Sequence, residues 1–313
     1  MIDASSCHRG IFSIGDPLPG YAFPTTVSYE PLSERLWTAS DGIYRTIFAE
    51  GDQGVVAFDT FWSPAAAASY RTAVNRVFPD RETHTVIYSH DHLDHCGFAA
   101  DFAPEATTVL AHEEAARVIE ARHSDGQVVP NRTWSGERVR VQVDGLAFEL
   151  INPGATHGNG NVAAWFPEER VLFMVDTVIP GVGYTFLPDW HLDSYLTNMR
   201  RLEALNWERF IPGHFWPLDR AGFEANLRFY ERMADAARHA LADGVDHDHY
   251  ASVNAYARER LRDEFGRQFR FGEYIGMNLM RFMIHEVTGG WGLEDAGGAV
   301  ERPLEPATEE IHL

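Results

Sequence analysis

The pattern of hydrophobic and polar residues predicts strands that alternate with helices through the first two thirds of the chain. Residues 36–59 alternate between apolar and polar side chains, and glycines mark a turn at 51–54, which predicts a hairpin ending at Asp59. Residues 64–78 have helical spacing and are rich in alanine. The further elements that we expect are a strand at 85–89, the start of a helix at 96–103, a strand at 107–112, a helix at 113–123, hairpins at 138–150 and 161–176, a helix at 192–205 and a short strand at 209–214.

Long amphipathic segments replace the short strands after about residue 220. They predict helices at 222–244, 252–269 and 273–287. The expected fold is α+β, a sandwich of two sheets covered by helices, with a C-terminal helical extension. The chain is divided into an irregular strap rich in proline and glycine at 1–31, a domain at 32–220, and the helical extension with a loose tail at 221–313.

Composition and charge narrow the range of functions. The 313 residues are 45% hydrophobic and 23% charged, which is typical of a globular protein, and carry a formal net charge of −20. This charge argues against nucleic acid and against an anionic membrane surface as partners, and no apolar run is long enough for a membrane span. All 26 cationic side chains are arginine, which excludes Schiff-base, P-loop and Ser-x-x-Lys mechanisms. Two cysteines and no visible signal peptide predict a cytoplasmic protein.

The most unusual stretch is SHDHLDHCG at 89–97, directly after a predicted buried strand. Its three histidines, His90, His92 and His95, offer imidazole nitrogens. Asp94 adds a carboxylate oxygen, and this donor set suits zinc and also iron or manganese. Four such ligands within six residues cannot all reach one tetrahedral ion, so the crowding indicates two metal ions side by side. Cys96 is expected to be a small buried packing residue.

Three more residues fit the same kind of site. His157 lies in NPGATHGNGN and His214 in IPGHFWP, each at the exit of a predicted strand, where glycines let the backbone turn tightly. Asp176 ends the apolar strand in VLFMVDTVIPG, where a carboxylate is costly unless it is paired or bound to a metal.

The order of these motifs resembles the metallo-β-lactamase superfamily. The shared pattern is His-x-His-x-Asp-His, a later Gly-x-x-His, an apolar strand ending in Asp-Thr, and Pro-Gly-His. The resemblance covers about residues 32–218 and implies the four-layer αββα sandwich of that superfamily. It also implies that Asp59, in GVVAFDT, supports the metal-binding loop through an imidazole.

The resemblance further implies a role for each candidate ligand. His90, His92 and His157 hold one ion. Asp94, His95 and His214 hold the second, and Asp176 bridges the two. Asp94 and Asp176 are the catalytic carboxylates. Asp176 bridges the two ions, and Asp94 is placed to pass a proton to the leaving group. The expected cofactors are two divalent metal ions, with zinc first and iron or manganese as alternatives.

A bridging aspartate resembles the glyoxalase II, lactonase and esterase branches of the superfamily more than its β-lactamases. The expected reaction is hydrolysis of a small, largely apolar carboxylic ester or lactone by water activated between two ions. Thioester, phosphoester and β-lactam hydrolysis remain alternatives. From other classes, an iron-dependent oxidoreductase on the same scaffold and a binding protein with a purely structural metal also remain open.

Aromatic residues that follow Asp176 and His214 are expected to line a substrate pocket, with ordinary packing as the equal alternative. The candidates are Tyr184, Phe186, Trp190, His191, Phe215 and Trp216. The helical extension has three open interpretations, namely a lid, a dimer contact or additional core. The expected partners are a small-molecule substrate and, in a homodimer, a second copy of the chain.

Overall fold

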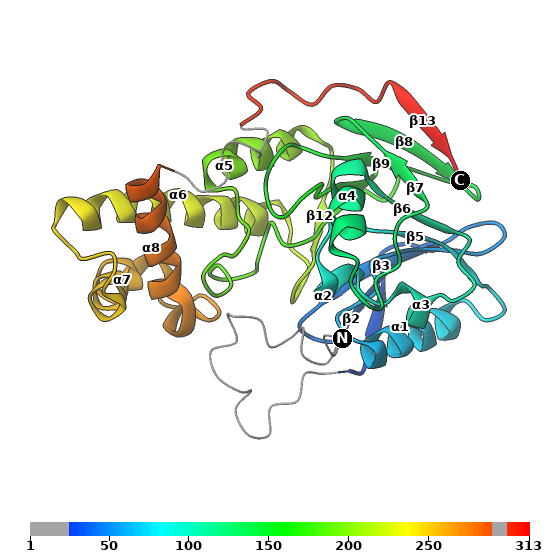
Figure 1. The fold of residues 1–313 in the computed structure, drawn as a ribbon, viewed down its shortest axis with the longest axis horizontal. Coiled ribbons are helices and arrows are strands. Elements are labelled where there is room, and N and C mark those ends of the chain that lie inside the picture. The colour runs from blue at the N-terminus through cyan, green and yellow to red at the C-terminus, as the bar shows by residue number, and fades with distance from the viewer. Residues whose placement is uncertain (1–24, 290–298) are drawn as a thin grey trace.

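The computed structural model describes residues 25–289 and 299–313, and its strands form two sheets (Figure 1). In the first sheet the strands follow one another in chain order. They are antiparallel from β1 to β4 and parallel from β4 to β7. These strands are β1 (Ser28–Pro31), β2 (Leu36–Ser40), β3 (Arg45–Glu50), β4 (Val55–Phe58), β5 (Thr83–Ile87), β6 (Thr108–His112) and β7 (Arg132–Trp134).

The second sheet has the order β12-β11-β10-β9-β8-β13. Its central strands are antiparallel, and both edge strands, β12 and β13, pair in parallel with their neighbours. The strands are β8 (Arg138–Val143), β9 (Leu146–Ile151), β10 (Ala163–Phe166), β11 (Val171–Met174), β12 (Arg209–Pro212) and β13 (Glu309–His312).

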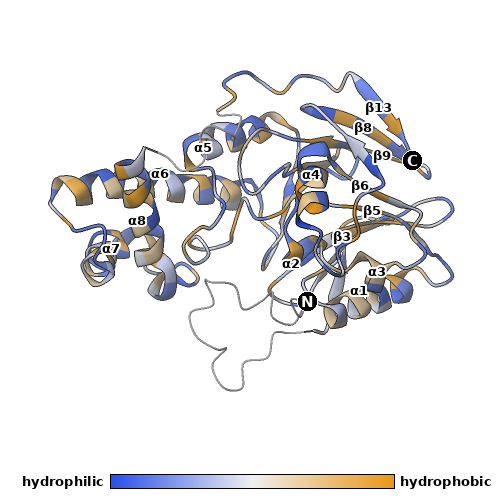
Figure 2. Cartoon of the chain, in the orientation of Figure 1, coloured by the Kyte–Doolittle hydropathy of each residue, from blue (hydrophilic) through white to orange (hydrophobic). Residues whose placement is uncertain are grey.

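Helices cover the outer faces of both sheets (Figure 1). On the side of the first sheet they are α1 (Pro64–Val77), α2 (Leu93–Cys96), α3 (Ala99–Phe102) and α4 (Glu113–Arg122). On the side of the second sheet they are α5 (Leu192–Arg201), the 3-10 turn at Leu202–Ala204, α6 (Arg220–Ala242), α7 (Tyr250–Phe265) and α8 (Phe271–Thr288). Several of these helices carry both hydrophobic and hydrophilic stretches, as expected for elements with one buried face (Figure 2).

The two sheets and the helices on their outer faces make four layers, and three hydrophobic clusters pack between them. All four residues of strand β4 are buried because both faces of the sheet are covered. Successive side chains along the strand point to opposite faces of the sheet. Val55 and Ala57 pack under the helices of the first sheet, whereas Val56 and Phe58 pack against the second sheet. On β11, Phe173 faces the layer between the sheets and the next residue along the chain faces α5 and α6. The predicted αββα sandwich is therefore confirmed.

The predicted helical extension is also confirmed. Helix α6 packs on the outer face of the second sheet, and α7 and α8 pack against α6 away from the sheets (Figure 1). The apolar stripe of α8 contributes Phe282 and Met283 to the same hydrophobic cluster as Tyr230 of α6. Phe282 and Met283 are therefore core residues of the helical extension. None of the helices in the described part of the chain has the length and apolarity that a membrane span requires.

Five sequence predictions need correction. Residues 36–59 form three strands, because Asp41 accepts hydrogen bonds from Ile43 and Tyr44 and creates an extra turn before β3. The expected helix start at 96–103 is instead two single turns, α2 and α3. The strand expected at 85–89 begins and ends two residues earlier, as β5.

The two ends of the chain account for the other corrections. Residues 1–24 of the predicted strap lie outside the described residues, but Ser28–Pro31 is not irregular, because it pairs with β2 and forms the edge of the first sheet as β1. The tail is not loose at Glu309–His312, which pairs with β8 as the edge strand β13. In both cases an exposed sheet edge offers unpaired backbone groups to a short terminal segment. The wider division of the chain into three parts stays a prediction.

Candidate metal centre

The topology brings the candidate ligands together at the ends of parallel strands. In the first sheet β4 and β5 are parallel with Phe58 opposite Ile87, so Asp59 and the cluster that starts at His90 emerge at one edge. In the second sheet β11 and β12 are parallel, with Met174 opposite Pro212. Asp176 and His214 each lie two residues beyond these paired positions, so both reach the same edge of the sandwich.

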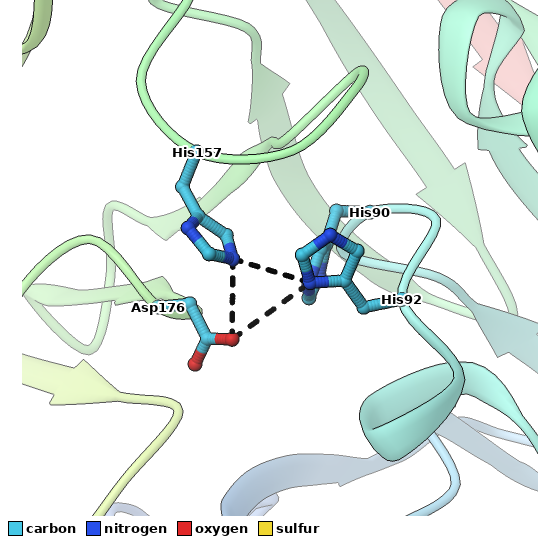
Figure 3. A group of neighbouring side chains, drawn as sticks. All are labelled: His90, His92, His157 and Asp176. Carbon is cyan, nitrogen blue, oxygen red and sulfur yellow. Dashed lines mark hydrogen bonds and ion pairs between the residues drawn. The ribbon is translucent and has the colours of Figure 1, made fainter. Parts of the chain in front are cut away.

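Four side chains form the first group of facing ligand atoms (Figure 3). His157 Nε2 lies 3.2 Å from His92 Nδ1 and 3.4 Å from Asp176 Oδ2. His90 Nε2 lies 3.8 Å from the same carboxylate oxygen. His92 thus turns its Nδ1 inward, whereas His90 and His157 present Nε2.

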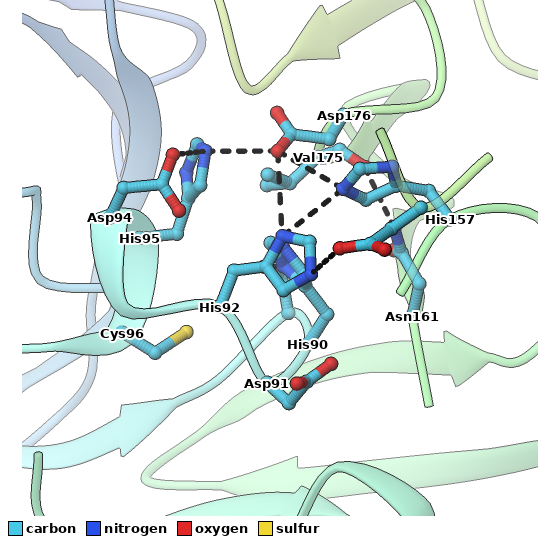
Figure 4. A network of polar contacts seen from close by, with 12 residues as sticks. His90, Asp91, His92, Asp94, His95, Cys96, His157, Asn161, Val175 and Asp176 are labelled. Carbon is cyan, nitrogen blue, oxygen red and sulfur yellow. Dashed lines mark hydrogen bonds and ion pairs between the residues drawn. The ribbon is translucent and has the colours of Figure 1, made fainter. Parts of the chain in front are cut away.

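A second group shares Asp176 with the first (Figure 4). His95 Nε2 is 3.2 Å from Asp176 Oδ2, and His214 Nε2 is 2.8 Å from Asp176 Oδ1. Asp94 lies at the edge of this group, with its Oδ2 3.8 Å from His95 Nε2. The seven residues predicted from the sequence as ligands therefore converge, and Asp176 stands between the two groups.

The spacing of these atoms is compatible with metal ions between the side chains. Zinc binds imidazole nitrogen at about 2.0–2.1 Å, so two ligands of one tetrahedral ion lie roughly 3.3 Å apart. The separations within both groups, from 2.8 to 3.8 Å, bracket that value. The inward nitrogens of His90 and His95 are closed off from solvent and make no hydrogen bond with the described residues. Buried polar atoms without partners are rare, and one cation in each group would give each of these two nitrogens a partner.

The outward nitrogens of three ligands have separate anchors. Ser89 Oγ lies 2.8 Å from His90 Nδ1, and Asp189 Oδ2 lies 3.2 Å from His92 Nε2. The carbonyl oxygen of Ile43 lies 3.1 Å from His214 Nδ1. Such partners fix which nitrogen carries the proton and how each ring is turned.

Asp59 supports the loop by another route than the resemblance implies. Its Oδ1 accepts hydrogen bonds from the backbone N–H of Ser89, at 2.8 Å, and from the Cys96 thiol, at 3.0 Å. Among the described residues it has no hydrogen bond to an imidazole. Burial raises the pKa of Asp59, and the nearby His95 acts in the opposite direction. Cys96 is fully buried as expected, and its hydrogen bond to Asp59 fastens the end of the histidine loop to the residue after β4.

Burial and the shared carboxylate set the proton affinities in the centre. Burial lowers the pKa of His90 well below its ordinary value, and the neighbouring His92 adds to this effect. Burial acts in the same direction on His95, but Asp176 and Asp94 outweigh it and raise its pKa to about 9. Burial favours protonation of Asp176, yet the imidazoles of His95 and His214 hold its pKa well below the ordinary range. The Asp176 carboxylate therefore stays charged and is stabilised by the imidazoles around it.

One side of the centre is open to solvent. The side chains of His90, His95 and His157 are almost fully buried. In contrast, the Asp94 side chain is 35% exposed and that of Asp189 is 64% exposed. A substrate therefore has access to the centre past these two carboxylates.

The structure separates the six residues predicted to line a substrate pocket. Trp190 packs on His157 with ring centroids 4.5 Å apart, and the ring of Tyr184 is nearly parallel to that of His214 at 6.1 Å. Phe215 is buried 5.9 Å from the His214 ring. These three aromatic rings lie beside ligands, so a role in substrate contact remains a proposal for them.

The other three candidates make no ring contact with a predicted ligand in the described part of the chain. Trp216 lines a separate cavity of about 260 Å³ that includes none of the seven predicted ligands. His191 uses its Nε2 to contact the carbonyl of Gly158 at 3.0 Å and, together with His157, lines a polar cavity of about 160 Å³. Phe186 is half-buried.

Two residues of the site escaped the sequence analysis. Tyr44 donates from its hydroxyl to Asp94 Oδ2 at 3.3 Å, and its ring lies 5.1 Å from the ring of His95 and 4.8 Å from that of His214. Burial, with Asp94 next, raises the pKa of the Tyr44 phenol, so it stays protonated and donates. Asp189, the anchor of His92, lies beside the predicted Trp190. The only sequence signal for it was a carboxylate in the loop that follows Asp176.

Comparisons with known proteins agree with this geometry. The family model described as the metallo-beta-lactamase superfamily matches residues 41–214, more than half of the chain. The 2,4-dinitroanisole O-demethylase subunit alpha of Nocardioides sp. (strain JS1661) is 51% identical over 292 residues, which cover 93% of this chain and 89% of that protein. The subunit beta from the same organism is 30% identical over 84% of this chain and 83% of its own length.

Solved structures agree on the fold. The metallo-beta-lactamase from Pontibacter korlensis superposes with a TM-score of 0.58 at 18% identity, covering 66% of this chain and 99% of that chain. The inverting sec-alkylsulfatase Pisa1 from Pseudomonas sp. superposes with a TM-score of 0.68 at 15% identity, covering 87% of this chain and 50% of that chain. At these identities the solved structures support the fold alone.

Proposed function

The chain belongs to the metallo-beta-lactamase superfamily, and from this premise we propose that it is a metal-dependent hydrolase that removes the methyl group of an electron-poor aryl methyl ether. The observation that carries the proposal is the 51% identity, along 93% of the chain, to a protein named as a 2,4-dinitroanisole O-demethylase subunit. The seven converging side chains supply the matching chemistry.

The proposed reaction needs only water as co-reactant. The oxygen of hydroxide attacks the ring carbon that bears the methoxy group, and the bond from that carbon to the methoxy oxygen breaks. The methoxy group takes up a proton and leaves as methanol, and the ring is left as a phenol. Electron-withdrawing groups on the ring, such as the nitro groups in the name of the relative, make that carbon open to attack.

The ligand residues divide between two proposed metal positions. His90, His92 and His157 would hold the first ion, and His95, His214 and Asp94 would hold the second, with Asp176 available to both. Two divalent ions bound there would lower the pKa of a water molecule and polarise the oxygen of the substrate. Zinc is the first choice, because imidazole and carboxylate donors at this spacing suit it.

Asp94 is the proposed proton carrier. Its carboxylate is the only one among the seven ligands that is substantially exposed, and it stands on the open side of the centre. It takes the proton that the attacking water loses and returns it to the methoxy oxygen as the bond to the ring breaks. Tyr44 donates to Asp94 Oδ2 and so leaves the other carboxylate oxygen free for this transfer.

Aromatic side chains next to the ligands supply a surface for a planar substrate. The Tyr184 ring is nearly parallel to that of His214, packs edge-on with Tyr274 at 5.4 Å and is only partly buried, so its exposed part is suited to contact an aromatic ring of the substrate. The exposed carboxylate of Asp189 at the open side favours a neutral substrate over an anionic one, which makes a phosphoester less suitable.

Hydrolysis of a carboxylic ester or lactone, predicted from the sequence, remains the second candidate. The observation that favours it is the same centre, because a shared aspartate between two metal positions suits attack on a carbonyl carbon as well as on an activated ring carbon. A panel that contains an aryl ether, a lactone and a simple ester separates the two candidates.

The test is turnover of 2,4-dinitroanisole by the zinc-loaded chain under argon in water labelled with the heavy oxygen isotope. We expect methanol and dinitrophenol in equal amounts, with the label in the phenol. Formaldehyde as the product, with turnover in air but none under argon, would mean oxidative demethylation, and label in the methanol would mean attack on the methyl carbon. Turnover of a lactone without turnover of the ether would favour the second candidate. Asp94→Asn serves as the catalytically impaired control of nearly equal size.

We also propose that the chain works together with a second, homologous chain. Relatives at 51% and 30% identity are named as the alpha and beta subunits of one demethylase. The assay above is therefore run on this chain alone and on the chain co-expressed with a homologue of the beta type. A complex of unequal subunits by native mass spectrometry supports the pairing, whereas a stable homodimer with full activity contradicts it.

A further inference from the structure

The loop between β11 and α5, residues 177–191, touches ligands of both metal positions. Asp189 Oδ2 lies 3.2 Å from the outward Nε2 of His92. The adjacent Trp190 packs on His157, and Tyr184 lies over His214. One segment therefore contacts three imidazoles from the solvent side.

Helix α8 of the extension holds this loop from outside. Asn278, which is fully buried, donates from Nδ2 to the carbonyl oxygen of Thr185 at 2.7 Å. Arg281 donates from Nη2 to the carbonyl oxygen of Trp190 at 3.3 Å, immediately after Asp189. At the start of the loop, Val182 donates its backbone N–H to Phe269, in the turn before α8.

The backbone of the loop needs this support. Thr185, Leu187 and Asp189 have φ angles of 46°, 51° and 58°, in the left-handed region that non-glycine residues rarely adopt. Such conformations persist where surrounding contacts impose them. The hydrogen bonds from α8 are made at Thr185 and next to Asp189, where two of these strained residues lie.

We propose that Asp189 is a positioning residue for His92, and that helix α8 contributes to the affinity of the first metal position by holding the loop that carries Asp189. His92 presents Nδ1 to the centre, so its Nε2 carries the proton and donates to the Asp189 carboxylate. A carboxylate on the outer nitrogen of a metal-binding histidine fixes the tautomer and ring orientation and makes the ligand more basic. The inference rests on the two-metal site proposed above.

The alternative is that Asp189 and His92 form an ordinary surface ion pair. The Asp189 side chain is 64% exposed, and pairs of that kind contribute little to stability. The two interpretations differ in what they predict for metal binding, because loss of a surface pair leaves the affinity of the site unchanged.

The experiment measures zinc affinity by competition with a chromogenic chelator. All variants are made in a His214→Ala background, which removes a ligand of the second position and leaves the first to report. Asp189→Ala is expected to weaken zinc binding by about 10–100-fold. Asp189→Asn keeps an oxygen acceptor for His92 and is expected to restore most of that loss.

The matched control is Asp52→Ala. Asp52 is 70% exposed and pairs with Arg35 at 3.2 Å, in the turn between β3 and β4, away from α8 and the loop 177–191. Its removal also deletes an exposed, ion-paired aspartate, and zinc affinity is expected to stay unchanged. Circular dichroism and thermal unfolding of each variant establish that the fold is kept.

A double-mutant cycle tests the part played by α8. Asn278→Ala is expected to weaken zinc binding in the same direction as Asp189→Ala and by less. If α8 acts through Asp189, the double variant should bind zinc no more weakly than Asp189→Ala alone. The reason is that Asn278 has no further effect once the Asp189 carboxylate is absent. Additive effects would contradict this link.

The outcomes separate this inference from the site on which it rests. If the His214→Ala protein binds no zinc at the first position, the proposed site is wrong and the inference falls with it. If that protein binds zinc and Asp189→Ala binds it equally well, the site stands and only the role of Asp189 is overturned.

Discussion

The two proposed metal positions use similar ligands but are supported by different ends of the chain. The first position, with His92 and His157, is backed by the loop 177–191, which α8 holds. The second position is backed by the turn before β3. There Ile43 anchors His214, Tyr44 donates to Asp94, and the N–H of Arg45 bonds to the carbonyl of Gly213.

The proposed centre therefore lies between the N-terminal strands and the C-terminal extension, and each of these parts supports the ligands of one metal position. Asp176 alone belongs to both positions, because its carboxylate faces His157 on one side and His214 on the other. Each position can therefore be weakened from its own support, whereas loss of Asp176 affects both. The predictions below use this asymmetry.

The largest expected effect is that of Asp176→Ala, which removes the shared ligand. Both positions should lose affinity by more than about 100-fold, since partners outside the ligand set alone are worth 10–100-fold. Elemental analysis after gel filtration and turnover of the substrate panel measure the effect. Two retained ions with wild-type turnover would remove the basis for a shared carboxylate.

The next effect separates the two positions. His157→Ala should empty only the first position and His214→Ala only the second, each leaving one ion per chain and less than about a hundredth of the turnover. Zinc titration by calorimetry counts the ions. Loss of both ions from either variant would show that the positions depend on each other, contrary to the separate supports described here.

A smaller effect is expected from Tyr44→Phe, which keeps the ring against His95 and His214 and removes only the hydroxyl that donates to Asp94. The second ion should bind about 10-fold more weakly and the first as before. Tyr184→Phe is the matched control, because it also keeps a ring beside His214 and leaves the bond to Asp94 intact. Equal affinities in the two variants would exclude a positioning role for Tyr44.

The smallest effect on the centre is expected from Glu137→Gln, far from both positions. Glu137 pairs with Arg201 at 2.5 Å and with Arg302 at 2.9 Å, and so fastens the segment that leads to β13. Zinc binding should not change, whereas the free energy of unfolding at neutral pH should fall by about 1–3 kcal/mol, as for hydrogen bonds to charged groups. Urea unfolding at two pH values measures it.

The free energy of unfolding that Glu137→Gln loses should become smaller as the pH falls. Burial raises the pKa of Glu137, but the hydrogen bond from Arg201 and the other contacts outweigh it, so the folded pKa lies below the ordinary value. The contribution to stability is present above the unfolded pKa and is lost as the pH falls through the folded one. Wild type and Glu137→Gln should therefore converge in stability at acid pH. A constant difference between them would contradict the ion-pair explanation.

The sequence alone pointed to all seven proposed ligands because each of them has a local signal. His90, His92 and His95 are close together in the chain, and Asp176 and His214 each follow an apolar strand. Their meeting depends only on which parallel strands are neighbours, and the motif order of a known superfamily supplied that arrangement.

The supporting residues could not be found in this way. Tyr44 and Asp189 act on residues 50 and 97 positions away, and nothing in their own neighbourhood marks them, since tyrosines and aspartates are common on loops. Phe215 and Trp216 show the same limit on a smaller scale. Both rings pack on Phe269, but only Phe215 is buried beside His214, whereas Trp216 lines a separate cavity. Strand β13 was missed because its four mostly exposed residues carry no apolar pattern and are ordered by the edge of β8.

The most direct test of the central claim is anomalous diffraction at the zinc edge from crystals of the zinc-loaded protein. The account predicts two peaks about 3.5–4 Å apart. One peak should lie among the imidazoles of His90, His92 and His157, the other beside His95 and His214, and Asp176 should contact both. A single peak, or peaks away from Asp176, would contradict a centre built from two supported halves.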